Sequence, residues 1–223
     1  MNIKKAVFPV AGFGTRFLPA TKATPKEMLP VIDKPLIQYA VEEAAKIGVE
    51  EFIFITHHAK SAIDKHFKNN EDFYELLVKQ GKNDLADSIK DIGGANAKFI
   101  SVDQGEPKGL GHAIGCANDL IDEDEFFAVI LADDLIFSDG SNVLEQMRDQ
   151  AEKYNKQVLA LEKIPQKDIS KFGVVNPSSS DGRISHLSGI VEKPAVADAP
   201  SDLAVVGRYI FKKDIFSHID NYS

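Results

Sequence analysis

The sequence predicts an α/β protein with three layers: a mixed, mostly parallel sheet with helices on both faces. Three observations support this fold class. Apolar, strand-like runs alternate with helical patterns through the first half of the chain. A loop with two glycines follows the first run, as in open sheets that bind ligands at the ends of their strands. The 223 residues are 43% apolar, enough for the core of one large or two small domains.

The first half of the chain supplies most of the expected parallel sheet. Its apolar runs predict strands at 4–10, 51–56, 97–102 and 126–132. Helices are expected at 36–47, where Gly48 marks the end, at 60–67, 71–80 and 83–91, and from Gly111 to Leu120. The three helices between 60 and 91 are short and rich in charge, so we interpret them as an insertion over the core.

The pattern changes to a more β-rich one after a helix expected at 141–154. The expected strands of this part are 157–163, 172–176, 183–193 and 203–212. The run from Pro177 to Gly182 predicts a turn, and a last helix is expected at 214–219. We therefore expect a single domain over 1–223, with a nucleotide-binding part at 1–135 and a β-rich part at 136–223 that share one sheet.

Composition excludes several classes of protein. The net charge is −8 and the sequence has no basic stripe, which argues against a nucleic-acid partner. No apolar run is long enough to span a membrane, and no secretory segment follows Met1, so we expect neither a membrane nor a secreted location. A lone cysteine, Cys116, suits a reducing cytoplasm, and its small apolar neighbours predict a packed core position.

The loop after the first strand has the features of a phosphate-binding loop. Gly12 and Gly14 allow the backbone to approach a ligand closely, and successive N–H groups there can bind an anion. Arg16 and Lys26 add two cations ten residues apart. The loop matches neither a P-loop nor a dinucleotide fingerprint, which needs a third glycine. A lone Gly-x-Gly is also common in plain strand-to-helix turns, but the following Thr24-Pro25-Lys26-Glu27-Met28-Leu29-Pro30 favours nucleotide binding.

Two further polar motifs follow expected strands. Asp133 and Asp134 follow a strand too apolar for a surface edge, so a divalent metal ion, Mg²⁺ above all, could neutralise them; a helix cap or a solvated turn is the alternative. Gln104 opens a loop with Gly109 and Gly111, and its amide could read the edge of a base, although such a loop could equally be a bare turn. We expect His112 to begin a helix without a catalytic role.

A third motif, Glu192-Lys193-Pro194, follows Val191. The carboxylate could accept hydrogen bonds from sugar hydroxyls and the ammonium could hold a sugar phosphate; a solvated surface pair is the alternative. The sequence shows no Ser/His/Asp relay, zinc cluster or Cys/His pair. Their absence favours direct transfer of a phosphoryl-type group, in which positioning and charge stabilisation carry the rate.

Seven motifs in order along the chain resemble the sugar-nucleotide pyrophosphorylases, most closely the bacterial uridylyltransferases that act on glucose 1-phosphate. They are Ala11-Gly12-Phe13-Gly14-Thr15-Arg16, Pro25-Lys26-Glu27-Met28-Leu29-Pro30, Lys34-Pro35-Leu36-Ile37-Gln38-Tyr39, Gly109-Leu110-Gly111-His112, Leu131-Ala132-Asp133-Asp134-Leu135, Phe172-Gly173-Val174 and Val191-Glu192-Lys193-Pro194. The resemblance implies a Rossmann-like nucleotidyltransferase fold, similar to glycosyltransferase A, and the reaction of UTP with glucose 1-phosphate to UDP-glucose and pyrophosphate.

The resemblance also implies roles for site residues, residue by residue. The implied catalytic residues are Arg16, Lys26 and Lys193; the nucleotide-binding residues are Ala11, Gly12, Gly14, Thr15, Glu27, Gln104 and Gly109; the sugar-phosphate residues are Gly173, Glu192 and Lys193; the Mg²⁺ ligands are Asp133 and Asp134. Mn²⁺ could replace Mg²⁺ in vitro.

Two departures from the family pattern bear on these expectations. Ala132 stands where relatives often have proline or glycine, a change that we expect to be tolerated. The family normally continues beyond residue 223 with a further carboxylate near the metal and with subunit contacts, so we expect a truncated C-terminus and a homo-oligomer in the full-length protein. A catalytically silent nucleotide-sugar-binding subunit and a thymidylyl- or cytidylyltransferase remain open alternatives, since one amide cannot separate uracil from thymine.

Overall fold

The computed structural model describes residues 1–57, 61–106 and 108–220, which fall into two compact units. The first unit comprises Met1–Val158 and Tyr209–Ser223, and the second comprises Leu159–Arg208. The boundary differs from the expected division after residue 135, because the helix at 143–154 and the end of the chain belong to the first unit. That the two units act as a single domain stays a prediction.

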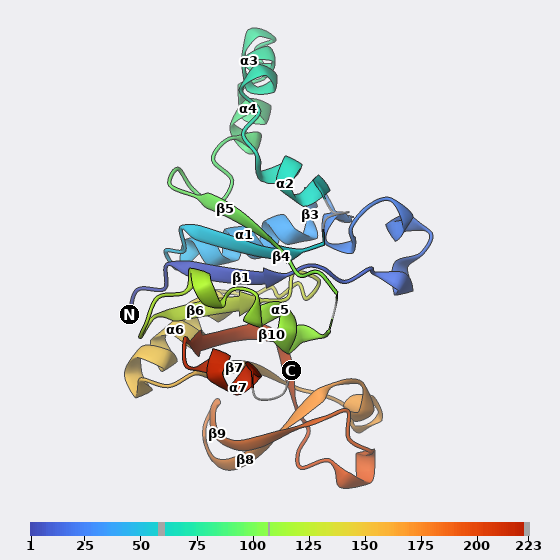
Figure 1. Cartoon of the computed structure of the whole chain (residues 1–223), viewed down its shortest axis with the longest axis vertical. Coiled ribbons are helices and arrows are strands. Elements are labelled where there is room, and N and C mark those ends of the chain that lie inside the picture. The colour runs from blue at the N-terminus through green and yellow to red at the C-terminus, as the bar shows by residue number, and fades with distance from the viewer. Residues whose placement is uncertain (58–60, 107, 221–223) are drawn as a thin grey trace. The chain divides into compact units, whose positions relative to one another are not determined.

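Parallel strands form the centre of the first unit (Figure 1). β1 (Lys5–Pro9) lies between β4 (Glu51–Thr56) and β6 (Phe126–Ile130), and β5 (Lys98–Asp103) pairs with β4. All three pairings are parallel, which confirms the predicted mostly parallel sheet. β6 is two residues shorter than predicted, so Asp133 lies in a loop beyond it.

Alternating side chains of the strands pack into helices on opposite faces of the sheet. Val7, Ile53 and Val129 belong to one buried cluster with residues of α5 (Leu110–Gly115) and α7 (Ile215–Asp220). On the other face, Phe54 stacks on Phe67 of α2 (Ser61–Phe67) at a centroid distance of 5.1 Å. This alternation is the reason why the strands read as continuous apolar runs.

The remaining helices of the first unit follow the sequence prediction, with one exception among all the predicted helices. Their bounds are α1 (Leu36–Lys46), α3 (Glu71–Lys79), α4 (Asn83–Ile89) and α6 (Val143–Tyr154). The helix expected from Gly111 to Leu120 is wrong as one element: α5 ends at Gly115, and a separate 3-10 turn covers Asn118–Leu120. Residue 60, the expected start of the second helix, lies outside the described residues. A small hairpin of β2 (Pro30–Val31) and β3 (Lys34–Pro35) was not predicted.

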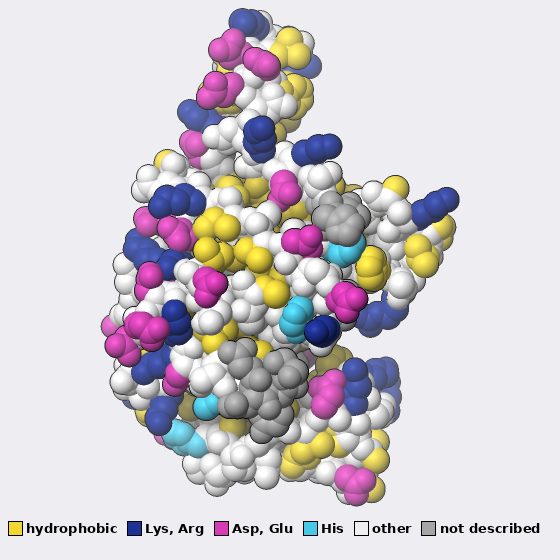
Figure 2. All heavy atoms as spheres, in the orientation of Figure 1, with side chains coloured by type: hydrophobic (Ala, Val, Ile, Leu, Met, Phe, Trp, Pro, Cys, Tyr) yellow, Lys and Arg dark blue, Asp and Glu magenta, His cyan; other side chains and the backbone are white. Residues whose placement is uncertain are grey.

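The charge-rich insertion covers the core only in part. α2 buries Ile63 and Phe67, whereas α3 and α4 pack on each other and bury only Leu77 and Ala86. Acidic and basic side chains are mixed over the viewed face (Figure 2). Cys116 directly follows α5 and packs against the apolar cluster, and burial raises the pKa of its thiol, consistent with the predicted packed position.

The second unit is built from antiparallel strands. β8 (Gly173–Asp181) pairs with β9 (Ile184–Glu192) and with β10 (Leu203–Lys212), and β7 (Val158–Lys163) also pairs with β10. Its small core contains Ile164, Ile169, Val174 and Ala204; Ile169 comes from the 3-10 helix Gln166–Lys171, which was not predicted. β10 continues into the first unit, where the order β5-β4-β1-β6-β10 holds.

The turn predicted at 177–182 occurs only at the end of that run, where Gly182 and Arg183 join β8 to β9. β8 continues to Asp181, and the register shifts on both sides of Pro177, where an irregularity accommodates the missing N–H. The serines form cross-strand bonds: Ser178 Oγ donates to the His186 carbonyl at 3.1 Å, and Ser180 and Ser185 join through their hydroxyls at 2.9 Å. Residue types that usually form turns therefore lie in a strand here, because the partner strand supplies hydrogen-bond partners for their hydroxyl groups.

No helix in the described part of the chain has the length and apolar character needed to cross a membrane.

Candidate active site

The loop after β1 folds back on itself around Gly14. The strand hydrogen bonding ends with the Val10 N–H, which donates to the Ile55 carbonyl at 2.8 Å. Gly14 has φ +63°, and a Cβ there would lie 3.0 Å from Lys26 Cβ and 3.2 Å from Thr21 Cγ2. A side chain is disfavoured both by the left-handed backbone and by lack of space. Gly14 thus allows the segment that carries Lys26 to pack directly on the loop.

Lys26 and Asp133, 107 residues apart in sequence, form an ion pair. Lys26 begins the 3-10 helix Lys26–Met28, and its Nζ lies 2.5 Å from Asp133 Oδ2 and 3.9 Å from Glu27 Oε1. The side chains of Lys26 and Asp133 are 17% and 28% exposed, whereas that of Glu27 is 1% exposed. A cation from the 3-10 helix Lys26–Met28 and a carboxylate beyond the end of β6 are therefore held together, still within reach of solvent.

Asp133 and Asp134 follow a fully buried strand. All five residues of β6 are buried, and the Asp134 N–H closes a turn by donating to the Leu131 carbonyl at 3.2 Å. Asp133 is half-buried and Asp134 is exposed. The two carboxylates thus differ in setting, and Asp133 is the one that forms the ion pair with Lys26 described above.

Gln104 lies at the end of β5. Its N–H donates to the Thr56 carbonyl at 2.8 Å, and its side chain is almost completely buried. The side-chain Nε2 lies 3.3 Å from the Gly109 carbonyl oxygen and 3.1 Å from His112 Nδ1. Gly109 has φ +106°, in a position where a Cβ would meet open space, so backbone conformation rather than crowding requires glycine. Residue 107 of this loop lies outside the described residues.

A cavity of about 280 Å³ brings many of the predicted residues together. Six predicted site residues line it: Ala11, Gly12, Lys26, Gln104, Gly109 and Asp133. They belong to the segments that follow β1, β5 and β6 of the parallel sheet, at the edge where open sheets bind ligands. Pro9, Leu110, Ala113 and Leu131 also line it and were not predicted; each is adjacent to a predicted motif but carries no polar side chain that would have identified it.

The other predicted residues of the first unit are near these in sequence but do not line the cavity. They are Gly14, Thr15, Arg16, Glu27 and Asp134. Thr15 and Arg16 lie on the 3-10 helix Thr15–Phe17 and are exposed, whereas Glu27 is buried beside Lys26.

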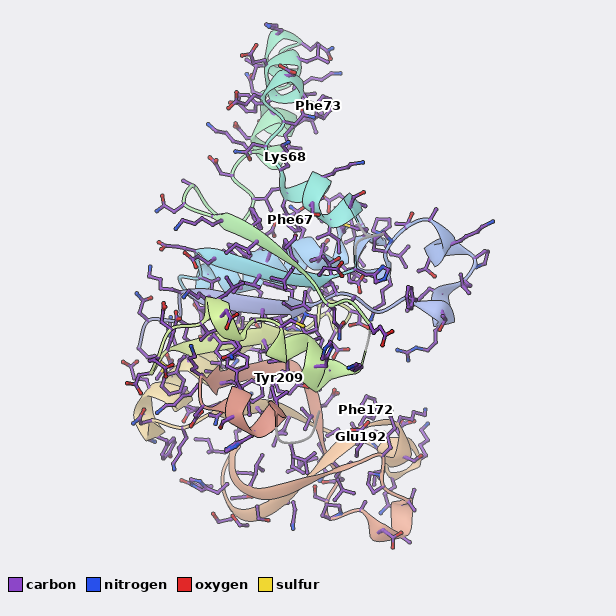
Figure 3. The ribbon with its side chains drawn as sticks, viewed as in Figure 1. Phe67, Lys68, Phe73, Phe172, Glu192 and Tyr209 are labelled. Carbon is purple, nitrogen blue, oxygen red and sulfur yellow. The ribbon has the colours of Figure 1, made fainter. Side chains whose placement is uncertain are left out.

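The sugar-phosphate residues predicted from the sequence belong to the second unit. Gly173 pairs with Glu192 across β8 and β9, and a Cβ on Gly173 would lie 3.1 Å from Glu192 Oε2. The Lys193 N–H donates to the Phe172 carbonyl at 3.0 Å; Figure 3 shows Phe172 and Glu192 on these adjoining segments. Lys193 Nζ lies 3.2 Å from Glu192 Oε1, with both side chains more than half exposed. The structure thus brings the three residues together at one end of the hairpin.

Comparisons with known proteins agree with this arrangement. A UTP–glucose-1-phosphate uridylyltransferase of Bacillus subtilis (strain 168) is 42% identical over 219 residues, which are 98% of this chain and 74% of the relative. A UTP-bound UGPase from Acinetobacter baumannii superimposes with a TM-score of 0.91 at 40% identity, covering 98% of this chain and 78% of that one. A UDP-glucose pyrophosphorylase complexed with UDP-glucose gives 0.86 at 44% identity, with coverage of 98% and 80%. A family model described as nucleotidyl transferase matches residues 5–223, and the chain belongs to this family.

Proposed function

We propose that this protein transfers a uridylyl group from UTP to glucose 1-phosphate, giving UDP-glucose and pyrophosphate. The observation that carries the proposal is the cavity of the first unit, where Gly12, Lys26, Gln104 and Asp133 converge. It offers close backbone approach, a cation, an amide and a carboxylate, the four features that a nucleoside triphosphate with its metal ion requires. The names of relatives with 42% and 44% identity support the choice of UTP and glucose 1-phosphate.

In this proposal the first unit binds UTP. Gln104 and Gly109 contact the uracil together with Ala11, Gly12 and the buried Glu27, whereas Gly14 and Thr15 shape the loop along the phosphates. Lys26 and Arg16 hold the triphosphate. Lys26 can hold a phosphate because its side chain is fixed at the cavity. Arg16 lies on the exposed 3-10 helix Thr15–Phe17 and would have to approach the phosphates when the nucleotide binds.

The second unit supplies the contacts to the other substrate. We assign Glu192 to the sugar hydroxyls and Lys193 to the phosphate, with Gly173 leaving room between them. Lys193 has φ +46°, an unusual conformation for a lysine, in the turn that follows β9. Residues held in such conformations are concentrated at functional sites, which supports a binding role for this turn.

Transfer proceeds as a direct in-line displacement. A phosphate oxygen of glucose 1-phosphate forms a bond to the α-phosphorus of UTP, while the bond from that phosphorus to the bridging oxygen breaks and its electron pair leaves with pyrophosphate. The attacking oxygen is already an anion near neutral pH, so no general base is required. Rate enhancement comes from bringing two polyanions together and stabilising the charge, which is the task of Lys26, Arg16 and Lys193.

Nucleotidyl transferases generally use a divalent metal ion, and we propose Mg²⁺ for this protein. Among the described residues, no group of three His, Cys, Asp or Glu side chains could hold a metal ion. Asp133 and Asp134 fit a site that is completed by phosphate oxygens, because Mg²⁺ is usually bound by one or two carboxylates and substrate phosphates. When bound there, the ion would neutralise phosphate charge.

The proposal is tested by measuring pyrophosphate release with glucose 1-phosphate, Mg²⁺ and each nucleoside triphosphate in turn, with and without EDTA. We expect metal-dependent turnover with a preference for UTP. Turnover with dTTP or CTP in preference would indicate a thymidylyl- or cytidylyltransferase. Binding of UTP without turnover of any triphosphate would refute the enzymatic proposal and indicate a binding subunit. We further propose that the protein acts in the cytoplasm. We also propose that the full-length protein is a homo-oligomer, which sedimentation of the purified full-length protein would test.

A further inference from the structure

Both N–H groups of the Gln104 amide are engaged inside the protein. Nε2 lies 3.3 Å from the Gly109 carbonyl oxygen and 3.1 Å from His112 Nδ1, and the side chain is only 7% exposed. A carbonyl oxygen can only accept a hydrogen bond, so the amide nitrogen, not the amide oxygen, must face Gly109. The same nitrogen then donates its second hydrogen to Nδ1, which requires the His112 tautomer with its proton on Nε2.

The amide oxygen of Gln104 is the polar atom left for a ligand. Gln104 lines the cavity, and within residues 1–57, 61–106 and 108–220 no donor bonds to Oε1. The side chain therefore presents an acceptor to whatever occupies the cavity. It cannot present a donor without turning over, which would set Oε1 against the Gly109 carbonyl and, in this tautomer of His112, against the lone pair of Nδ1.

We propose that His112 is a positioning residue that fixes the Gln104 amide in this orientation and so selects bases that carry an N3–H group. The inference rests on the proposed binding of a nucleotide in this cavity. Uracil has a hydrogen on N3 and can donate it to Oε1. Cytosine has a lone pair on N3, which would face the lone pairs of Oε1, and two acceptors that meet inside a buried site are costly. Thymine also carries an N3–H group, so the fixed Gln104 amide discriminates between UTP and CTP but not between UTP and dTTP.

His112 is needed because the bond from Gln104 to Gly109 is the longer of the two. At 3.3 Å it lies beyond the usual range for N–H···O bonds. Without an acceptor at the Nδ1 position, only this bond would oppose rotation of the amide by half a turn. A rotated amide would present Nε2 to the base, which cytosine N3 can accept. Loss of the acceptor should therefore weaken discrimination between the two nucleotides rather than abolish binding.

Three substitutions at the same position separate this role from simple packing. His112→Asn keeps an acceptor, because the Oδ1 of Asn can occupy the place of Nδ1. His112→Gln puts its amide nearer the place of Nε2, and His112→Leu has no acceptor. We would measure dissociation constants of UTP, CTP and dTTP with Mg²⁺ by calorimetry, and kcat/KM for each with glucose 1-phosphate. The preference for UTP over CTP should fall about tenfold in the Leu and Gln variants and stay within about threefold of wild type in the Asn variant.

Gln104→Met provides the test that His112 acts through Gln104. In this background, adding His112→Leu should leave the ratio of UTP to CTP affinity unchanged, since the group that His112 positions is gone. The ratio of UTP to dTTP affinity should not move in any variant. Should the Leu variant fail to fold, the comparison of Gln with Asn decides.

Three results would overturn the inference: equal wild-type affinity for UTP and CTP, a wild-type ratio in both the Leu and the Gln variants, or no rescue by Asn. Failure of the proposed function is a distinct outcome. Wild-type protein that prefers UTP in calorimetry but releases no pyrophosphate would refute catalysis, while the binding ratios would still decide the role of His112.

Discussion

Replacing Lys26 by alanine should leave the first unit folded and lower the turnover of UTP and glucose 1-phosphate by about two to three powers of ten. Lys26 Nζ is fixed at the cavity, 2.5 Å from Asp133 Oδ2, and its side chain is 17% exposed. A unit charge at about 4 Å from a phosphate oxygen, with an effective dielectric constant near 20, contributes roughly 4 kcal/mol before desolvation. Partial solvent access reduces this to about 3 to 4 kcal/mol of transition-state stabilisation, the size of a single lost charge contact in other active sites.

The fold should survive because Asp133 is 28% exposed and water can solvate its carboxylate when the ammonium is removed. Lys22→Ala is the matched control, since Lys22 lies four residues earlier, is exposed and does not line the cavity. Steady-state pyrophosphate release measures turnover, and thermal unfolding measures the fold. Turnover within about threefold of wild type in Lys26→Ala, or an equal loss in Lys22→Ala, would refute the assignment of Lys26.

Three further predictions concern the metal, the loop and the pH dependence of stability. Asp133→Asn should lower turnover at least about a hundredfold and weaken Mn²⁺ binding, measured by electron paramagnetic resonance, because a neutral amide attracts a cation poorly; unchanged Mn²⁺ affinity would exclude Asp133 as a ligand. Gly14→Ala should lower the free energy of unfolding by about 2 to 3 kcal/mol, whereas Gly81→Ala should lower it by about 1 kcal/mol. Both glycines have positive φ, but of the two only Gly14 lacks room for a Cβ. Equal losses in urea titrations would contradict the packing argument. Burial lowers the pKa of His66 in the folded protein below its ordinary 6.5. The unfolded chain therefore binds a proton at a higher pH than the folded protein does, and the free energy of unfolding should fall as the pH drops from about 6.5 towards the lower folded pKa. His66→Gln should remove this part of the pH dependence, measured by urea titration at several pH values.

The sequence alone was sufficient to predict those strands whose residue pattern is set by their own local sequence. β1, β4 and β5 lie within one residue of their predicted bounds, because strands buried on both faces read as unbroken apolar runs. Lys26 and Gly12 could be assigned to a ligand site because their motif lies next to such a strand. Turn composition was correct for Gly182 but failed at 177–181, where the serines form hydrogen bonds with β9 and the residues continue as a strand.

Tertiary structure decided the contacts between residues that are distant in sequence or whose partners have no signature. The resemblance placed Lys26 and Asp133 in one site, but their direct ion pair across 107 residues was not predicted, because that contact depends on the order in which parallel strands assemble. His112 was expected only to begin a helix without a catalytic role, and the sequence did not predict its hydrogen bond with Gln104. A periodic pattern reports which face of an element is buried. Which polar atom meets which other depends on strand order and loop geometry, and these are fixed only when the whole chain packs.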